Sequence, residues 1–241
     1  MELAGAVVIV TGGAVRLGKA MVLGLARAGA RVVVHYGHSA DAARQTVAEV
    51  EHIGSEAYAI QADFMDASAA QSVIARAVEH FGHVDALVNS ASIYEPVGVA
   101  ETTEDLWDRH FAINLKAPFF LCQAFAAQLG DRRGHIVNIA DWRGTRPTAS
   151  RVAYTLTKAG LVAMTQSLAQ ALAPNVQVNA IAPGVILPPP GQGEEFVARL
   201  LPSIPLRHSG SPADIVAALL YLLRTTFVTG EVLYVTGGQH L

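Results

Sequence analysis

The sequence predicts an α/β fold, namely a single Rossmann-type, doubly wound, seven-stranded parallel sheet with helices on both faces. Short runs rich in Val and Ile alternate with longer helical patterns, and a glycine-rich turn joins the first run to the first helix. The 241 residues fit one core, and 51% hydrophobic against 15% charged residues excludes a disordered chain. We therefore expect one domain over residues 1–241.

The apolar runs predict seven strands, and the periodic stretches between them predict six long helices. The expected strands are Ala6–Thr11, Arg31–His35, Ala57–Gln61, Ala86–Asn89, His135–Ala140, Val176–Ile181 and Glu231–Val235. The expected helices are Leu17–Ala28, Ala40–Ile53, Ser68–Phe81, Trp107–Leu129, Val152–Leu172 and Pro212–Leu223.

A segment rich in Pro and Gly, residues 184–211, interrupts this alternation. It contains one short helical pattern around Glu194–Leu200. Long irregular segments inside compact domains usually have a function, so we expect a substrate lid here. A plain surface excursion is the alternative.

Composition and charge exclude several functions. With 17 basic and 20 acidic residues and no basic run, bulk charge does not favour nucleic acid. The apolar runs stop short of the ~20 residues that span a membrane, and the first residues do not resemble a signal peptide. We expect a cytoplasmic protein that binds no membrane. The lone Cys122 excludes an intramolecular disulfide, and the His and Cys spacing predicts no bound metal.

The glycine-rich turn Thr11–Gly18 opens a helix directly after the first strand. Free backbone N–H groups at a helix N-terminus bind a pyrophosphate, and Gly12 and Gly18 permit close approach of the backbone. This context predicts a dinucleotide site that includes Leu17.

The end of the second strand predicts which dinucleotide binds. An acidic residue there would bind the ribose 2′-hydroxyl of NAD, but the segment reads His35-Tyr36-Gly37-His38-Ser39. Arg16 lies in the glycine-rich turn, and a guanidinium with a hydroxyl suits a 2′-phosphate. We predict NADP(H), unless Arg16 serves only in a surface ion pair. After the third strand, Asp63-Phe64 offers a carboxylate for the adenine amino group or for capping the helix that starts near Asp66.

Tyr154 and Lys158 lie four residues apart, on one face of a predicted helix. Lowering a phenol pKa from ~10 toward ~7 costs ~4 kcal/mol, and one ammonium at ~4 Å supplies about that much. We therefore expect Lys158 to activate Tyr154. Proton donation beside a hydride donor describes the reduction of a polarised double bond.

These motifs together resemble the short-chain dehydrogenases/reductases over essentially the whole chain. The further matching stretches are Asn89-Ser90-Ala91-Ser92, Asn114 and Pro183-Gly184. The resemblance implies that Tyr154 is the acid/base, that Lys158 binds the nicotinamide ribose, and that Asn114 holds a proton-relay water. It also implies cofactor contacts at Asn89, Ala91, Pro183 and Gly184, and a homotetramer formed through the helices Trp107–Leu129 and Val152–Leu172.

The sequence departs from the family pattern at Asp141. Thirteen residues before the tyrosine most of the family has Ser, whereas this chain has Asp141. A carboxylate would repel the oxyanion that develops in ketone reduction. It suits a substrate with N–H groups, or a ring nitrogen that takes up a proton shared with Tyr154. The alternative is that Asp141 only caps a turn.

This substitution is similar to that of the pteridine reductases and dihydromonapterin reductases, a subgroup of the family. The Arg16 turn, the His35-Tyr36-x-x-Ser39 strand end and the aromatic Tyr94 after Ser92 agree with that subgroup. The resemblance implies that Tyr94 stacks on the pterin and that Ser92, Asp141 and Tyr154 line the substrate site. Core packing is the alternative for Tyr94.

We therefore expect NADPH-dependent reduction of a C=N bond in a pterin or dihydropterin. Hydride would reach a ring carbon and the proton a ring nitrogen. The alternatives are a general carbonyl or 3-oxoacyl-thioester reductase of the same family, or an NADP-binding protein without turnover. The sequence leaves open whether Trp142, Arg143 and Arg146 line the pocket.

Overall fold

The computed structural model describes residues 1–66, 68–189 and 191–241. Its seven strands form one parallel sheet in the order β3-β2-β1-β4-β5-β6-β7. The strands are β1 Val7–Val10, β2 Arg31–Tyr36, β3 Ala57–Gln61, β4 Ala86–Asn89, β5 Gly134–Ile139, β6 Val176–Pro183 and β7 Val232–Val235. The predicted fold class is confirmed.

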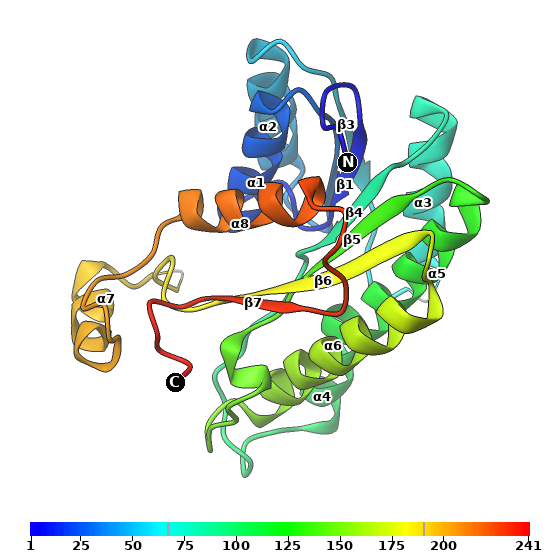
Figure 1. The fold of residues 1–241 in the computed structure, drawn as a ribbon. Helices are drawn as coiled ribbons and strands as arrows, with labels where there is room; N and C mark the ends of the chain where they lie inside the picture. The colour runs from blue at the N-terminus through cyan, green and yellow to red at the C-terminus, as the bar shows by residue number, and fades with distance from the viewer. Residues whose placement is uncertain (67, 190) are drawn as a thin grey trace.

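Helices cover both faces of the sheet (Figure 1). One face carries α1 Arg16–Arg27, α2 Ala40–His52 and α8 Pro212–Arg224. The other carries α3 Ala69–Phe81, α5 Ala117–Leu129 and α6 Val152–Ala171, with α4 Glu104–Phe111 packed beside α6. The order of the strands reverses between β1 and β4, and ligands of such sheets bind where the carboxyl ends of the strands meet this reversal.

The predicted helix Trp107–Leu129 is the main correction to the expected elements. It begins earlier, at Glu104, because the Thr103 side chain accepts a hydrogen bond from Leu106 N, at 3.2 Å. Its middle, η1 Ala112–Lys116, is a π-helical turn rather than α-helix. Such turns often mark functional sites, and this one contains Asn114. The other expected elements differ from the observed ones only at their ends.

The segment predicted to be a lid contains α7 Glu194–Leu200 and the 3-10 turn η3 Leu201–Ser203. It packs against the C-terminal residues, where Leu206 N donates to Gly237 O at 3.1 Å. Ile204 anchors it and is 1% exposed. Pro190, part of the same prediction, lies outside the described residues. In the described parts of the chain, no helix is long and apolar enough to cross a bilayer.

Candidate active site

A cleft of about 360 Å³ lies at the carboxyl ends of the central strands. It joins the glycine-rich turn to the Tyr154 helix. The predicted residues that line it are Gly12, Arg16, Leu17, Gly18, Ala91, Ser92, Asp141, Tyr154, Lys158, Pro183 and Gly184. The lining also includes Val15, Ser90, Ile139 and Ala140, to which sequence reasoning gave no role, and Ile186 and Leu187, which lie in the predicted lid.

The glycine-rich turn is built from close backbone contacts. A Cβ on Gly18 would lie 2.0 Å from Gly12 O, and one on Gly12 would lie 3.0 Å from Ala91 Cα. The first helical hydrogen bond runs from Lys19 N to Val15 O, so the preceding amides of α1 have no helical acceptor. These amides and the helix dipole fit a pyrophosphate.

His35 supports this turn from behind. Its side chain is buried and stacks on Phe64, with ring centroids 4.3 Å apart. Gly12 N donates to His35 Nδ1 at 3.1 Å, and His35 Nε2 lies 3.0 Å from Ala62 O. Both ring nitrogens are therefore engaged inside the protein, which favours a structural role for His35 and Phe64 over the predicted direct contact with the cofactor.

Burial lowers the pKa of His35 to about 4, and that of His135 likewise to about 4. Since the unfolded chain binds these protons near pH 6.5 and the folded chain only near pH 4, stability is lost as the pH falls through this window. Each histidine accounts for about 3 kcal/mol of this loss. The amide oxygen of His35→Asn can still accept from Gly12 N. When the pH falls, we expect the free energy of unfolding to decrease distinctly less in this variant than in the parent.

Urea unfolding across that pH window measures this effect. His52→Gln, at an exposed histidine, is the matched control and should follow the parent. A His35→Asn curve parallel to the parent's would contradict the prediction.

Arg16 lies at the mouth of the cleft in a strained conformation. Its φ of 52° places it in the left-handed region, which favours glycine. The guanidinium Nη2 donates to Pro188 O at 2.6 Å, so it contacts the predicted lid and not a carboxylate. The alternative of a surface ion pair therefore does not describe Arg16.

The other predicted adenosine residues follow the ends of β2 and β3. Tyr36 is half-buried, and Ser39 and Asp63 are exposed. The Asp63 carboxylate accepts from Met65 N at 3.0 Å, closing a turn. Because α3 begins only at Ala69, the alternative that Asp63 caps this helix is wrong.

Asp141 and Tyr154 meet at the reacting end of the cleft. The Tyr154 hydroxyl donates to Asp141 Oδ2 at 3.0 Å, while Asp141 Oδ1 accepts from Arg143 N at 2.8 Å. The carboxylate thus caps the 3-10 turn η2 Trp142–Gly144 and also binds the phenol. A turn cap alone does not account for this geometry.

The Lys158 ammonium lies beside the Tyr154 ring and donates to a backbone carbonyl. Its Nζ donates to Ile139 O at 2.8 Å and lies 5.6 Å from the centroid of the Tyr154 ring. Burial lowers the Lys158 pKa to about 8. Burial, followed by the charge of Asp141, raises the Tyr154 pKa well above its usual value. The phenol is therefore neutral, and the activation of Tyr154 by Lys158 stays a prediction.

Three polar residues behind the cleft have structural partners. Asn114 Oδ1 accepts from Ile93 N at 2.9 Å, and its Nδ2 donates to Ile93 O at 3.0 Å. The π-helical turn therefore fixes the backbone that leads to Tyr94.

Asn89 is buried and donates to Asn138 Oδ1 at 2.9 Å, so its side chain faces the core rather than the cleft. Thr11 Oγ1, which sequence reasoning missed, accepts from the amides of Ser90 and Ala91.

Tyr94 stands at the mouth of the site. It is 39% exposed, which rules out the alternative of plain core packing. Its ring meets the Tyr154 ring edge-on, with centroids 5.0 Å apart and planes at 88°. The guanidinium of Arg151 lies 5.4 Å over the Tyr94 ring. An exposed aromatic face next to the Tyr154 ring can bind a flat heterocycle.

The turn after β5 depends on Gly144, a residue without a predicted role. A Cβ at Gly144 would lie 2.8 Å from Lys158 O. Only glycine therefore lets this turn pack directly on α6, next to Tyr154 and Lys158. A glycine three residues after Asp141 is a weak sequence signal, because nothing in its surroundings distinguishes it from an ordinary turn glycine.

The sheet, the glycine-rich turn and the Tyr154–Lys158 pair define a dinucleotide-dependent oxidoreductase. Residues 6–195 match the short chain dehydrogenase family, and the chain belongs to this family.

Solved structures and a curated relative match nearly the whole chain. FolM alternative dihydrofolate reductase 1 from Brucella canis, solved with NADP, is 35% identical with a TM-score of 0.94, covering 99% of this chain and 95% of its own. A blue fluorescent protein from a metagenomic library, solved with NADPH, is 34% identical with a TM-score of 0.92, and 99% of each chain is covered. The 3-oxoacyl-[acyl-carrier-protein] reductase of Staphylococcus aureus is 33% identical, covering 97% of each chain.

Proposed function

We propose that this protein reduces a C=N bond in a pterin or dihydropterin with NADPH. The observation that carries the proposal is the 3.0 Å hydrogen bond from the Tyr154 hydroxyl to Asp141 Oδ2 in the cleft. A neutral phenol paired with a carboxylate can donate a proton to a ring nitrogen, while the carboxylate accepts substrate N–H groups. The FolM structure, whose name refers to dihydrofolate reduction, supports this choice of substrate class.

The residues of the cleft fit NADP(H). The amides at the start of α1 would hold the pyrophosphate, and Arg16, with Tyr36 and Ser39, would hold the 2′-phosphate. Lys158 would bind the nicotinamide ribose. The cofactor supplies a hydride to the substrate carbon.

The chain's own residues supply the proton. The Tyr154 O–H bond breaks as the proton passes to the ring nitrogen next to the reduced carbon, leaving a phenolate that solvent then protonates. Asp141 Oδ2 holds the hydroxyl in place before transfer, and the exposed face of Tyr94 orients the ring. Asn114 keeps the backbone before Tyr94 fixed.

Reduction of a ketone or 3-oxoacyl thioester is the second candidate, and the Staphylococcus aureus relative supports it. Against it, the Asp141 carboxylate would lie where a carbonyl oxygen gains negative charge. A third possibility is an NADP-binding protein without turnover.

NADPH oxidation with dihydrobiopterin, dihydromonapterin, dihydrofolate and a 3-oxoacyl thioester, repeated with NADH, tests the proposal. We expect turnover with the pterins and with NADPH. Faster turnover of the thioester would select the second candidate. A melting temperature raised by NADPH, with no oxidation by any substrate, would select the third.

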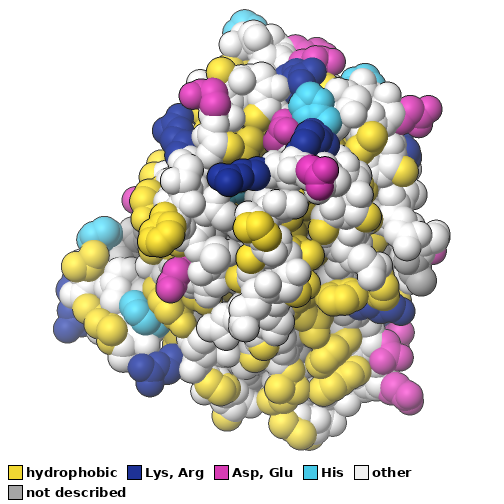
Figure 2. All heavy atoms as spheres, turned by 45° about the vertical axis from the view of Figure 1, so that its right-hand side comes forward, with side chains coloured by type: hydrophobic (Ala, Val, Ile, Leu, Met, Phe, Trp, Pro, Cys, Tyr) yellow, Lys and Arg dark blue, Asp and Glu magenta, His cyan; other side chains and the backbone are white. Residues whose placement is uncertain are grey.

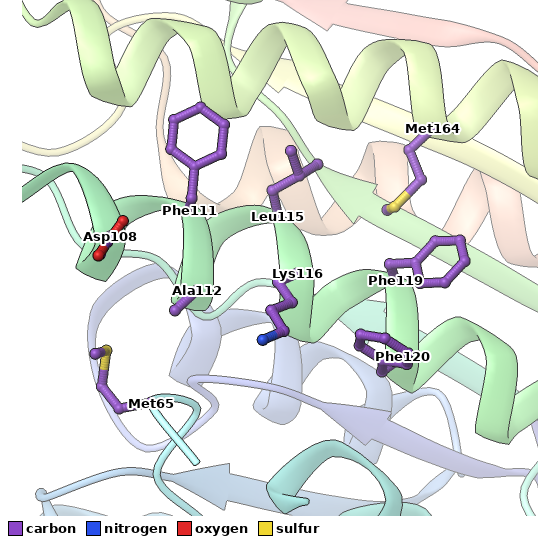
Figure 3. A pocket seen from close by; sticks show the side chains of 9 residues that line it. All are labelled: Met65, Asp108, Phe111, Ala112, Leu115, Lys116, Phe119, Phe120 and Met164. Carbon is purple, nitrogen blue, oxygen red and sulfur yellow. The ribbon is translucent and has the colours of Figure 1, made fainter. Parts of the chain in front are cut away.

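We also propose that the protein is a homotetramer. An apolar groove of about 710 Å³ runs along α4, η1 and α5 next to α6, the helices expected at the interface. Figure 3 shows Phe111, Leu115, Phe119 and Met164 along it. Hydrophobic side chains also gather on the lower part of the face seen in Figure 2. Exposed apolar side chains that lie together in this way support a contact with another protein chain.

A further inference from the structure

The two oxygens of the Asp141 carboxylate have different partners. Oδ2 accepts from the Tyr154 hydroxyl at 3.0 Å. Oδ1 accepts from Arg143 N at 2.8 Å, and Arg143 Nη1 lies 3.5 Å from the same oxygen. The side chains of Arg143 and Asp141 are 22% and 15% exposed. A partly buried guanidinium thus holds the oxygen that the phenol does not use.

The position of Arg143 is itself fixed by the fold. Its guanidinium lies 4.6 Å over the Trp142 ring. The turn that carries both residues packs on α6 because Gly144 has no side chain. Arg143 is therefore held against the site and is not a freely moving surface arginine.

Charged and titratable groups face Tyr154 from several elements. Asp141 approaches from the end of β5, Arg143 from η2, Tyr94 from the segment after β4, and Lys158 lies on the same helix. Arg143 lowers the Tyr154 pKa, opposing burial and Asp141, which raise it. The Lys158 ammonium donates a hydrogen bond to Ile139 O.

We propose that Arg143 is a positioning residue: it fixes the Asp141 carboxylate that receives the phenol hydrogen bond, and it offsets the negative charge of that carboxylate. This inference rests on the proposed pterin reduction. When Tyr154 passes its proton to the ring nitrogen, the phenolate that remains faces the Asp141 carboxylate. Two adjacent negative charges repel each other, and the Arg143 guanidinium reduces this repulsion.

Turnover of a dihydropterin by Arg143→Ala tests the positioning role. We expect kcat to fall about 10- to 100-fold with KM nearly unchanged. Arg143→Lys should keep part of the rate, and guanidinium ion at a low, non-denaturing concentration should partly rescue Arg143→Ala. Arg146→Ala, at an exposed arginine on the same segment, is the matched control and should match the parent. Equal rates for Arg143→Ala and Arg146→Ala would overturn the proposal.

A second measurement needs no substrate. Tyrosinate absorbance is titrated in Asp141→Asn and in Asp141→Asn/Arg143→Ala, with Tyr154→Phe in each background to isolate the Tyr154 signal. Removing Arg143 should move the Tyr154 titration to higher pH, because the nearby positive charge favours the phenolate. Coincident titrations would overturn the charge effect. If pterins are not turned over but the titration shifts, the substrate assignment fails while the effect of Arg143 on Tyr154 stands.

Discussion

Asp141→Ser is expected to lower kcat/KM for dihydropterin about 100-fold or more and to raise turnover of ketones. The substitution removes the oxygen that accepts from Tyr154 at 3.0 Å. It also removes the acceptor for substrate N–H groups, and an unpaired N–H in a site costs ~1–3 kcal/mol. A serine hydroxyl can instead donate to a carbonyl oxygen in the transition state. Steady-state kinetics with both substrate classes measure the change.

Two further variants separate the charge of Asp141 from the proton of Tyr154. Asp141→Asn keeps the size of the side chain and removes its charge, so it should also lose pterin turnover but gain less with ketones than Asp141→Ser. Tyr154→Phe should lose activity with both substrate classes, since both need the proton. Unchanged pterin turnover in Asp141→Ser would refute the proposed function.

Arg16→Gly is expected to weaken NADPH binding about 10- to 100-fold while leaving NADH binding nearly unchanged. The interaction that we expect this variant to lose is a charge-assisted hydrogen bond to the 2′-phosphate, worth ~1.5–3 kcal/mol. The same change relieves a φ of 52° that glycine adopts without strain, so the free energy of unfolding should rise by up to about 1 kcal/mol. Fluorescence titration and urea unfolding measure the two effects separately.

Arg207→Gly is the matched control for the backbone effect. Arg207 has a φ of 60° and is exposed, outside the residues that line the cleft. The Arg207→Gly variant should show a similar rise in the free energy of unfolding and keep its preference for NADPH. If Arg16→Gly bound NADPH as tightly as the parent, Arg16 would not be the 2′-phosphate residue.

The order of elements was predictable because each strand is a short apolar run, whereas in each crossover helix the apolar residues recur with the period of an α-helix. The lining residues that follow a strand or a glycine turn, such as Gly12 and Asp141, were predictable for the same reason. His35 was predicted as a cofactor contact from its place at a strand end. The structure instead buries it against Phe64, which lies in the turn after β3, and linear sequence does not reveal this contact.

The protonation of Tyr154 was the least predictable property of the site. The spacing of Tyr154 and Lys158 correctly places both in the cleft. It does not show that the ammonium points to Ile139 O, or that Arg143 contacts Asp141. Local charge balance depends on distances of a few ångströms between charged groups, and spacing along the chain does not give these distances.

The π-helical turn Ala112–Lys116 affects more than Asn114. A π-helical turn holds one residue more than the same stretch of α-helix. If one residue of this turn were deleted, the helix could close into regular α-helix, and Asn114 would lose its place beside Ile93. Ala112, Leu115 and Lys116 of the same turn line the apolar groove, so they would change position together with Asn114. One extra residue in this helix therefore sets both the place of Asn114 and the shape of the groove at this turn.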